Sequence, residues 1–120
     1  MDLLEVFKDS EDLVAVPAGA LIIREGDDGN QMYVVMKGEL VISLKNKILA
    51  TAGPGEIVGE MAMINADIRS ASVTAKSNCQ LIHIDPVSFN SLLRHVPEFT
   101  LHMMNVLTDR LQHAYDMIEE

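Results

Sequence analysis

The fold is constrained most by how closely short β-branched runs and turn signals alternate through the first 85 residues. Six runs have the composition of strands: "LIIRE", "MYVVM", "ELVISL", "ILATA", "SASVTA" and "QLIHI". The sequences between them are rich in turn residues, as in "EGDDGN", "KG", "KNK" and "GPGE". Such runs, with turn signals at short intervals, are typical of antiparallel barrels and sandwiches. The sequence therefore predicts β structure over residues 13–85.

Helical patterns replace this rhythm at Asp85, which suits a helix N-cap, and Pro86, which suits a first helical position. Pro97 restarts the chain. The segment after it carries apolar residues at alternating spacings of three and four: Met104, Leu107, Leu111, Ala114 and Ile118. We predict C-terminal helices over residues 86–118, the second with one apolar stripe, and a short N-terminal helix over residues 1–10.

The composition is that of a folded globular protein. The chain has 120 residues, of which 48% are hydrophobic and 22% charged, so we expect one domain over residues 1–120. The single cysteine, Cys79, lies in "NCQLIHI" and is expected to be a buried thiol, which fits a reducing cytoplasm. The N-terminus is acidic from Asp2 onward, unlike a secretory signal. No segment approaches the ~18 apolar residues of a membrane span. We therefore predict a cytoplasmic protein.

The net charge argues against two classes of partner. With 9 basic and 18 acidic side chains, the formal charge at pH 7 is −9. Such a chain repels nucleic acid and anionic membrane surfaces at long range. A small anion can still bind where local donors oppose this mean field.

Two charged residues stand among apolar neighbours in "GEIVGEMAMINADIRSASV", residues 55–73. The alternation of "SASVTA" puts Arg69 on the same strand face as Val73 and Ala75, which we expect to point inward. An arginine keeps its charge, and a buried unpaired ion is costly, so Arg69 requires an anion. Glu60 could supply it within the chain. An internal ion pair is therefore the structural alternative to a ligand site.

Three neighbouring features favour a ligand. "GPGE" and Gly59 place three glycines just before Glu60, as expected where backbone approaches a ligand. "EMAMI" could form one helical turn whose first N–H groups are an anion site. Ser70 adds a hydroxyl. Together they form a phosphate cradle with one carboxylate that can accept hydrogen bonds from sugar hydroxyls, so the implied ligand carries a phosphate and a ribose.

At this point the chain resembles the cyclic nucleotide-binding domain family, which includes the bacterial cAMP receptor protein and the regulatory subunits of cAMP-dependent protein kinase. "REGDDGNQMYVVMKGELVIS" resembles the family's glycine-punctuated hairpins, with Gly26, Gly29, Tyr33 and Gly38. Residues 55–73 resemble its phosphate-binding cassette. The resemblance runs from about Leu13 to Ile118. It implies an antiparallel β-roll, a double-stranded β-helix or jelly-roll-like barrel, followed by C-terminal helices.

The resemblance also assigns roles. Glu60 would accept the ribose 2′-hydroxyl, Arg69 would pair with the cyclic phosphate, and Ser70 would add a phosphate or base contact. The implied nucleotide-binding residues are Gly59, Glu60, Met61, Ala62, Arg69, Ser70 and Ala71. No catalytic residue, metal or other cofactor is implied.

Four positions depart from the family's pattern. Val58 replaces a bulkier apolar residue, and Ile68 replaces a frequent proline. In the cAMP receptor protein, hydroxyl residues beyond the similar "RLQ" run contact adenine, whereas Ala114 and Tyr115 follow here. Ser70 is small like the alanine of many cAMP sites, but its hydroxyl resembles the threonine of cGMP sites. We expect cAMP to be preferred to cGMP.

The function expected is a cyclic nucleotide sensor module without catalysis, whose C-terminal helices signal to a protein partner or a dimer mate. A homodimer through the last helix is expected, with Met103, Met104 and Met117 beside Leu107 and Leu111. Packing of that stripe on the barrel is the alternative. Two other functions compete with a sensor. One is a degenerate domain used only for protein contacts, and the other is a metal-dependent cupin, against which the histidines are scattered: His83, His95, His102 and His113.

Overall fold

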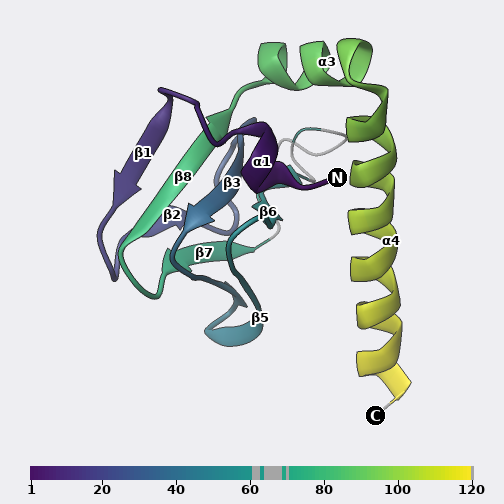
Figure 1. Ribbon diagram of the computed structural model, residues 1–120. Coiled ribbons are helices and arrows are strands. Elements are labelled where there is room, and N and C mark those ends of the chain that lie inside the picture. Colours follow the sequence, from purple (N-terminus) through teal and green to yellow (C-terminus); the bar gives the residue numbers. More distant parts are fainter. Residues whose placement is uncertain (61–62, 64–68, 70, 120) are drawn as a thin grey trace. The chain divides into compact units, whose positions relative to one another are not determined.

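The computed structural model of the chain describes residues 1–60, 63, 69 and 71–119 (Figure 1). The chain divides into two compact units, Asp2–Pro86 and Val87–Glu120 with Met1. The single domain expected over residues 1–120 stays a prediction.

Among the residues that the structure describes, the first unit contains the short helix α1 and eight strands. The helix is α1, Leu3–Val6. The strands are β1 (Leu13–Val16), β2 (Leu21–Ile23), β3 (Met32–Lys37), β4 (Leu40–Leu44), β5 (Lys47–Ala52), β6 (Ile57–Val58), β7 (Ser72–Ala75) and β8 (Cys79–Ile84). The six predicted strand runs each correspond to one of these strands. The additional strands are β1 and the two-residue β6.

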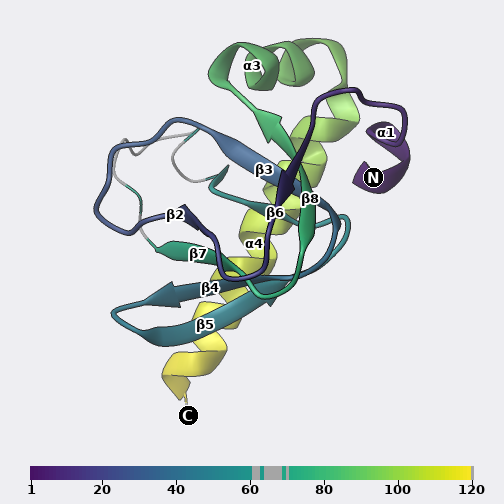
Figure 2. The same cartoon turned by 90° about the vertical axis from the view of Figure 1, so that its left-hand side faces the viewer.

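The eight strands form two antiparallel sheets of four, in the orders β1-β8-β3-β6 and β2-β7-β4-β5. Figure 2 shows the second sheet with its strands side by side in this order. In the first sheet, Val34 of β3 faces Ile82 of β8, and in the second, Ile42 of β4 faces Val73 of β7. The predicted antiparallel β-roll is confirmed. The sheets do not close into a barrel, because no ladder between described strands joins one sheet to the other.

The core of this unit consists of aliphatic side chains from both sheets. Its buried members are Ile23, Val35, Leu40, Ala52, Val58, Val73, Ala75, Cys79 and Leu81. Strand β7 shows the expected alternation, with Val73 and Ala75 buried and Ser72 and Thr74 half-buried. The thiol of Cys79 is buried, as predicted. Arg69 precedes this strand in the sequence and is also buried.

The N-terminal helix is shorter than predicted. It covers Leu3–Val6 instead of residues 1–10, with Asp2 as N-cap accepting hydrogen bonds from the amides of Leu4 and Glu5. Only Leu3 of this helix is buried. Isolated turns gain little from propensity, so with one buried anchor the helix ends after one turn.

The second unit contains α3 (Pro86–His95), apart from its first residue, and α4 (Pro97–Glu119). Both helices begin at the prolines that the sequence indicated. Phe89 of α3 and Phe99 of α4 pack edge to face, with ring centroids 5.9 Å apart, a favourable aromatic geometry. Among the described residues, no helix is both long and apolar enough to cross a membrane.

Apolar residues lie on two faces of α4. Met103 is buried, whereas Met104 is 60% and Leu111 54% exposed. Of the predicted stripe, Leu107 alone is half-buried, and Met104, Leu111, Ala114 and Ile118 are exposed. Because both faces carry apolar side chains, the 3.6-residue period did not show which face is covered.

Candidate functional site

The site is built around Arg69, whose backbone is held by the loop between β2 and β3. The amide of Arg69 donates to the carbonyl of Asp27 over 2.8 Å, and the amide of Gly26 donates to the carbonyl of Arg69 over 2.9 Å. Gly26 has a φ of 86°, a backbone conformation that favours glycine. This reciprocal pair of hydrogen bonds fixes Arg69 against a loop more than forty residues earlier in the chain.

The side chain of Arg69 is confined between two glycines. A side chain on Gly29 would overlap its guanidinium, and a Cβ on Gly59 would lie 3.0 Å from its NH1 atom. NH1 donates to the carbonyl of Gly59 over 3.3 Å. Arg69 is 9% exposed. The predicted inward orientation of Arg69 is therefore confirmed, while its role in nucleotide binding stays a prediction.

Burial also affects the electrostatics of Arg69. Desolvation lowers the pKa of Arg69, and the nearby phenol of Tyr33 has a weaker opposite effect. An arginine pKa starts so far above neutrality that the guanidinium stays charged at pH 7. The site therefore offers a fixed positive charge in a partly dehydrated position, where its attraction for an anion is screened less than on the surface.

Glu60 brings a carboxylate into the same part of the fold. It follows β6 and Gly59, and it is 2% exposed. Glu60 and Arg69 are the two buried charged side chains of the described chain. The guanidinium of Arg69 lies beside the residue that precedes Glu60, because the carbonyl of Gly59 accepts the hydrogen bond from Arg69 NH1. Gly59 has a φ of 79°, which is where a side chain would strain the backbone.

A second network fixes the strand that follows Arg69. Ser72 Oγ accepts from the amide of Glu25 over 3.0 Å and donates to Glu25 Oε1 over 3.2 Å. The same carboxylate accepts from the amide of Lys45 over 3.0 Å, at the β4–β5 turn where Lys45 and Asn46 have positive φ values. Glu25 thus ties the end of β2 to β7 and to the neighbouring hairpin.

The other sequence-predicted site residues divide into two groups. Ala71 is half-buried immediately before β7. Met61, Ala62 and Ser70 lie outside the described residues, as do Ile68 and most of the predicted "EMAMI" turn. Ala114 and Tyr115 are exposed on α4.

Sequence reasoning missed Glu25 and the contact between Gly29 and Arg69. Gly29 was noted only as one of the regularly placed glycines of a hairpin. The sequence feature that marks Gly29 is a second glycine in the acidic turn "EGDDGN". No three His, Cys, Asp or Glu side chains of the described chain are grouped in a way that could hold a metal ion.

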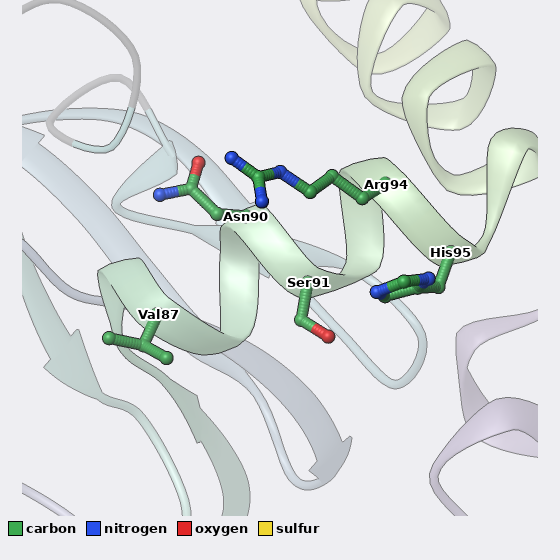
Figure 3. Close-up of a pocket in the computed structure, with 5 residues that line it drawn as sticks. All are labelled: Val87, Asn90, Ser91, Arg94 and His95. Carbon is green, nitrogen blue, oxygen red and sulfur yellow. The ribbon is translucent and has the colours of Figure 1, made fainter.

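A surface cavity of about 340 Å³ on α3 is a separate feature (Figure 3). It is lined by Val87, Asn90, Ser91, Arg94 and His95. Asn90 and Arg94 extend from one side of the helix and Ser91 and His95 from the other. All five side chains are exposed. This cavity contains no residue of the predicted site.

Three comparisons with known proteins agree on one family. A family profile described as "Cyclic nucleotide-binding domain" matches residues 13–96. The cAMP-dependent protein kinase regulatory subunit of Schizosaccharomyces pombe is 34% identical over an alignment of 113 residues, which covers 88% of this chain and 27% of that protein. This chain spans about a quarter of the length of the curated relatives it matches.

Solved structures show the same likeness. The Catabolite Activator Protein of Thermus thermophilus matches with a TM-score of 0.80 and 28% identity, over 89% of this chain and 53% of that one. The regulatory domain of Toxoplasma gondii PKA, crystallised with cAMP, matches with a TM-score of 0.62 and 35% identity, over 66% of this chain and 32% of that one.

Proposed function

Because this chain belongs to the cyclic nucleotide-binding domain family, we propose that it is a regulatory module that binds a cyclic nucleotide and catalyses no reaction. One observation carries the proposal: a buried, permanently charged Arg69 is fixed at both its backbone and its guanidinium, next to the segment that bears the buried Glu60. A binding site needs such preorganised groups, since ordering them at the moment of binding would reduce affinity.

The proposed roles follow the chemistry of the two charges. Arg69 pairs with the cyclic phosphate, because a guanidinium presents several donors in a fixed plane. Glu60 accepts a hydrogen bond from the ribose 2′-hydroxyl. Ser70 adds a phosphate or base contact, and the backbones of Gly59, Met61, Ala62 and Ala71 complete the cradle. The ligand itself supplies the anion that the positive charge of Arg69 requires.

We propose that the site prefers cAMP to cGMP. Two of the similar proteins bear cAMP in their descriptions, which supports this choice, and the hydroxyl of Ser70 keeps cGMP as the alternative. Isothermal titration of the purified chain with cAMP, cGMP and 5′-AMP decides between them. Heat should appear with cAMP at micromolar concentrations and not with 5′-AMP. Absence of heat with both cyclic nucleotides would refute the proposed function.

The proposed output passes through α4, as a homodimer with a second copy of the chain. Its exposed face carries side chains at alternating spacings of three and four: Leu101, Met104, Thr108, Leu111, Tyr115 and Ile118. This 3.5-residue repeat is the pattern of a two-stranded coiled-coil seam. Met103 is buried and therefore is not part of the proposed seam. Nucleotide binding would favour one position of the helices as far as its affinity differs between two states.

A second candidate function is a degenerate domain that makes only protein contacts. The exposed apolar face of α4 would serve it equally well. The titration separates the two candidates, since a degenerate domain would dimerise without binding any nucleotide. A reducing, cytoplasmic location is proposed for either function, since Cys79 is a free buried thiol.

A further inference from the structure

Gly29 and Arg69 are in close contact although forty residues separate them. Gly29 is half-buried in the β2–β3 loop. A Cβ placed on it would lie 2.7 Å from Arg69 Cζ and 2.9 Å from NH2, and would overlap Nε. Favourable contacts between such atoms lie at about 3.5–4.0 Å. The guanidinium therefore occupies the volume that any side chain at position 29 would need.

We propose that Gly29 is a positioning residue of the nucleotide site, which sets the location of the Arg69 guanidinium by having no side chain. This inference rests on the proposed role of Arg69. The same loop already holds the backbone of Arg69 through Gly26 and Asp27. Gly29 contacts the Arg69 side chain on one side. Gly59 contacts it as well, and its carbonyl accepts a hydrogen bond from NH1. The loop therefore fixes the backbone of Arg69 and also limits where its guanidinium can lie.

The two glycines beside Arg69 respond differently to substitution. Gly59 has a φ of 79°, and its Cβ would lie 2.9 Å from the carbonyl oxygen of Gln31, so alanine there strains the backbone itself. Gly29 has no left-handed backbone, and the atoms nearest its Cβ belong to the end of a long flexible side chain. Gly29→Ala should therefore preserve the fold while moving the guanidinium by about 1 Å, the difference between these contacts and normal ones.

A displacement of this size matters for binding and little for folding. Functional groups need placement within about 0.5 Å of the productive geometry. Losing one charge-assisted hydrogen bond to the phosphate lowers affinity about tenfold or more. Gly53 provides a matched control: it is not among the nucleotide-binding residues of the site, it too lacks a left-handed backbone, and the nearest atom to its Cβ, Glu56 Oε1, lies 3.8 Å away.

The test compares Gly29→Ala with Gly53→Ala by calorimetric titration with cAMP and by thermal melting. We expect Kd to rise about tenfold or more for Gly29→Ala and to stay within about twofold of wild type for Gly53→Ala. In an Arg69→Ala background, Gly29→Ala should cause no further loss, because coupled substitutions are not additive. Wild-type affinity for Gly29→Ala, or an equal loss in both backgrounds, would overturn the inference.

Two further readouts keep the test decisive. If Gly29→Ala lowers the melting temperature, adding Arg69→Lys should restore it, because lysine lacks the planar guanidinium, and no restoration counts against the inference. If the wild type binds no cyclic nucleotide, the proposed function fails, and the ligand-free ¹⁵N resonance of Arg69 Nε decides about Gly29. Gly29→Ala should shift that resonance and Gly53→Ala should not, and an unmoved resonance overturns the positioning role.

Discussion

Replacing Glu25 by alanine should destabilise the first unit, although Glu25 is not among the residues proposed to contact the nucleotide. The substitution removes the acceptor for the Ser72 hydroxyl at 3.2 Å and for the Lys45 amide at 3.0 Å. A hydrogen bond to a charged group contributes about 1.5–3 kcal/mol when partner groups become unsatisfied. Water can replace the acceptor at the exposed Lys45 amide, so we expect a loss of about 1–2 kcal/mol in the free energy of unfolding.

The assay is thermal and urea unfolding followed by circular dichroism. For a chain of this length, that loss corresponds to a fall in Tm of about 4–8 °C. Glu39→Ala is the matched control, because its carboxylate makes an exposed pair with Lys76 at 3.5 Å, worth about 0–1 kcal/mol. The double variant Glu25→Ala/Ser72→Ala should lose less free energy of unfolding than the sum of the losses of the two single variants, since both substitutions remove the same contact. Equal effects of Glu25→Ala and Glu39→Ala would refute the reasoning.

Two other predictions concern the dimer and the charge of Arg69. Leu111→Asp, at the exposed face of α4, should convert a dimer into monomers in light scattering at micromolar concentration. The adjacent exposed variant Gln112→Asp should remain a dimer. The proposed seam would be contradicted if both variants were dimers or both were monomers. Burial lowers the Arg69 pKa, so the cation is present at low pH and is lost only as pH rises toward that lowered value. Because this stays far above neutrality, cAMP affinity should be the same at about pH 6 and about pH 8, and a steep fall between them would assign the phosphate to another group.

Local patterns in the sequence predicted the local structure well. Turn residues and β-branched runs identified six strands, and the prolines at positions 86 and 97 identified the starts of α3 and α4. The alternation before β7 predicted that Arg69 points inward. These features depend on neighbours within a few residues, where steric and hydrogen-bonding preferences are visible in the sequence itself.

Features that depend on contacts distant in the sequence could not be predicted. A second glycine in an acidic turn marks Gly29, but nothing local tells that it supports a guanidinium forty residues later, or that Glu25 accepts hydrogen bonds from Lys45 and Ser72. Whether two sheets close into a barrel depends on strand pairing, and no ladder between the described strands joins the two sheets. The covered face of α4 likewise depends on its partners, because Met103 and Met104 are equally apolar but oppositely exposed.

The central claim is that Arg69 binds the phosphate of a cyclic nucleotide, and the most direct measurement is the ratio of the cAMP Kd values of Arg69→Ala and wild type in parallel calorimetric titrations. Loss of a charge-assisted bond predicts a ratio of about ten to a hundred or more. Arg94→Ala is the control, an exposed arginine on α3, and it should bind cAMP as tightly as the wild type. Equal affinities of wild type and Arg69→Ala would contradict the account.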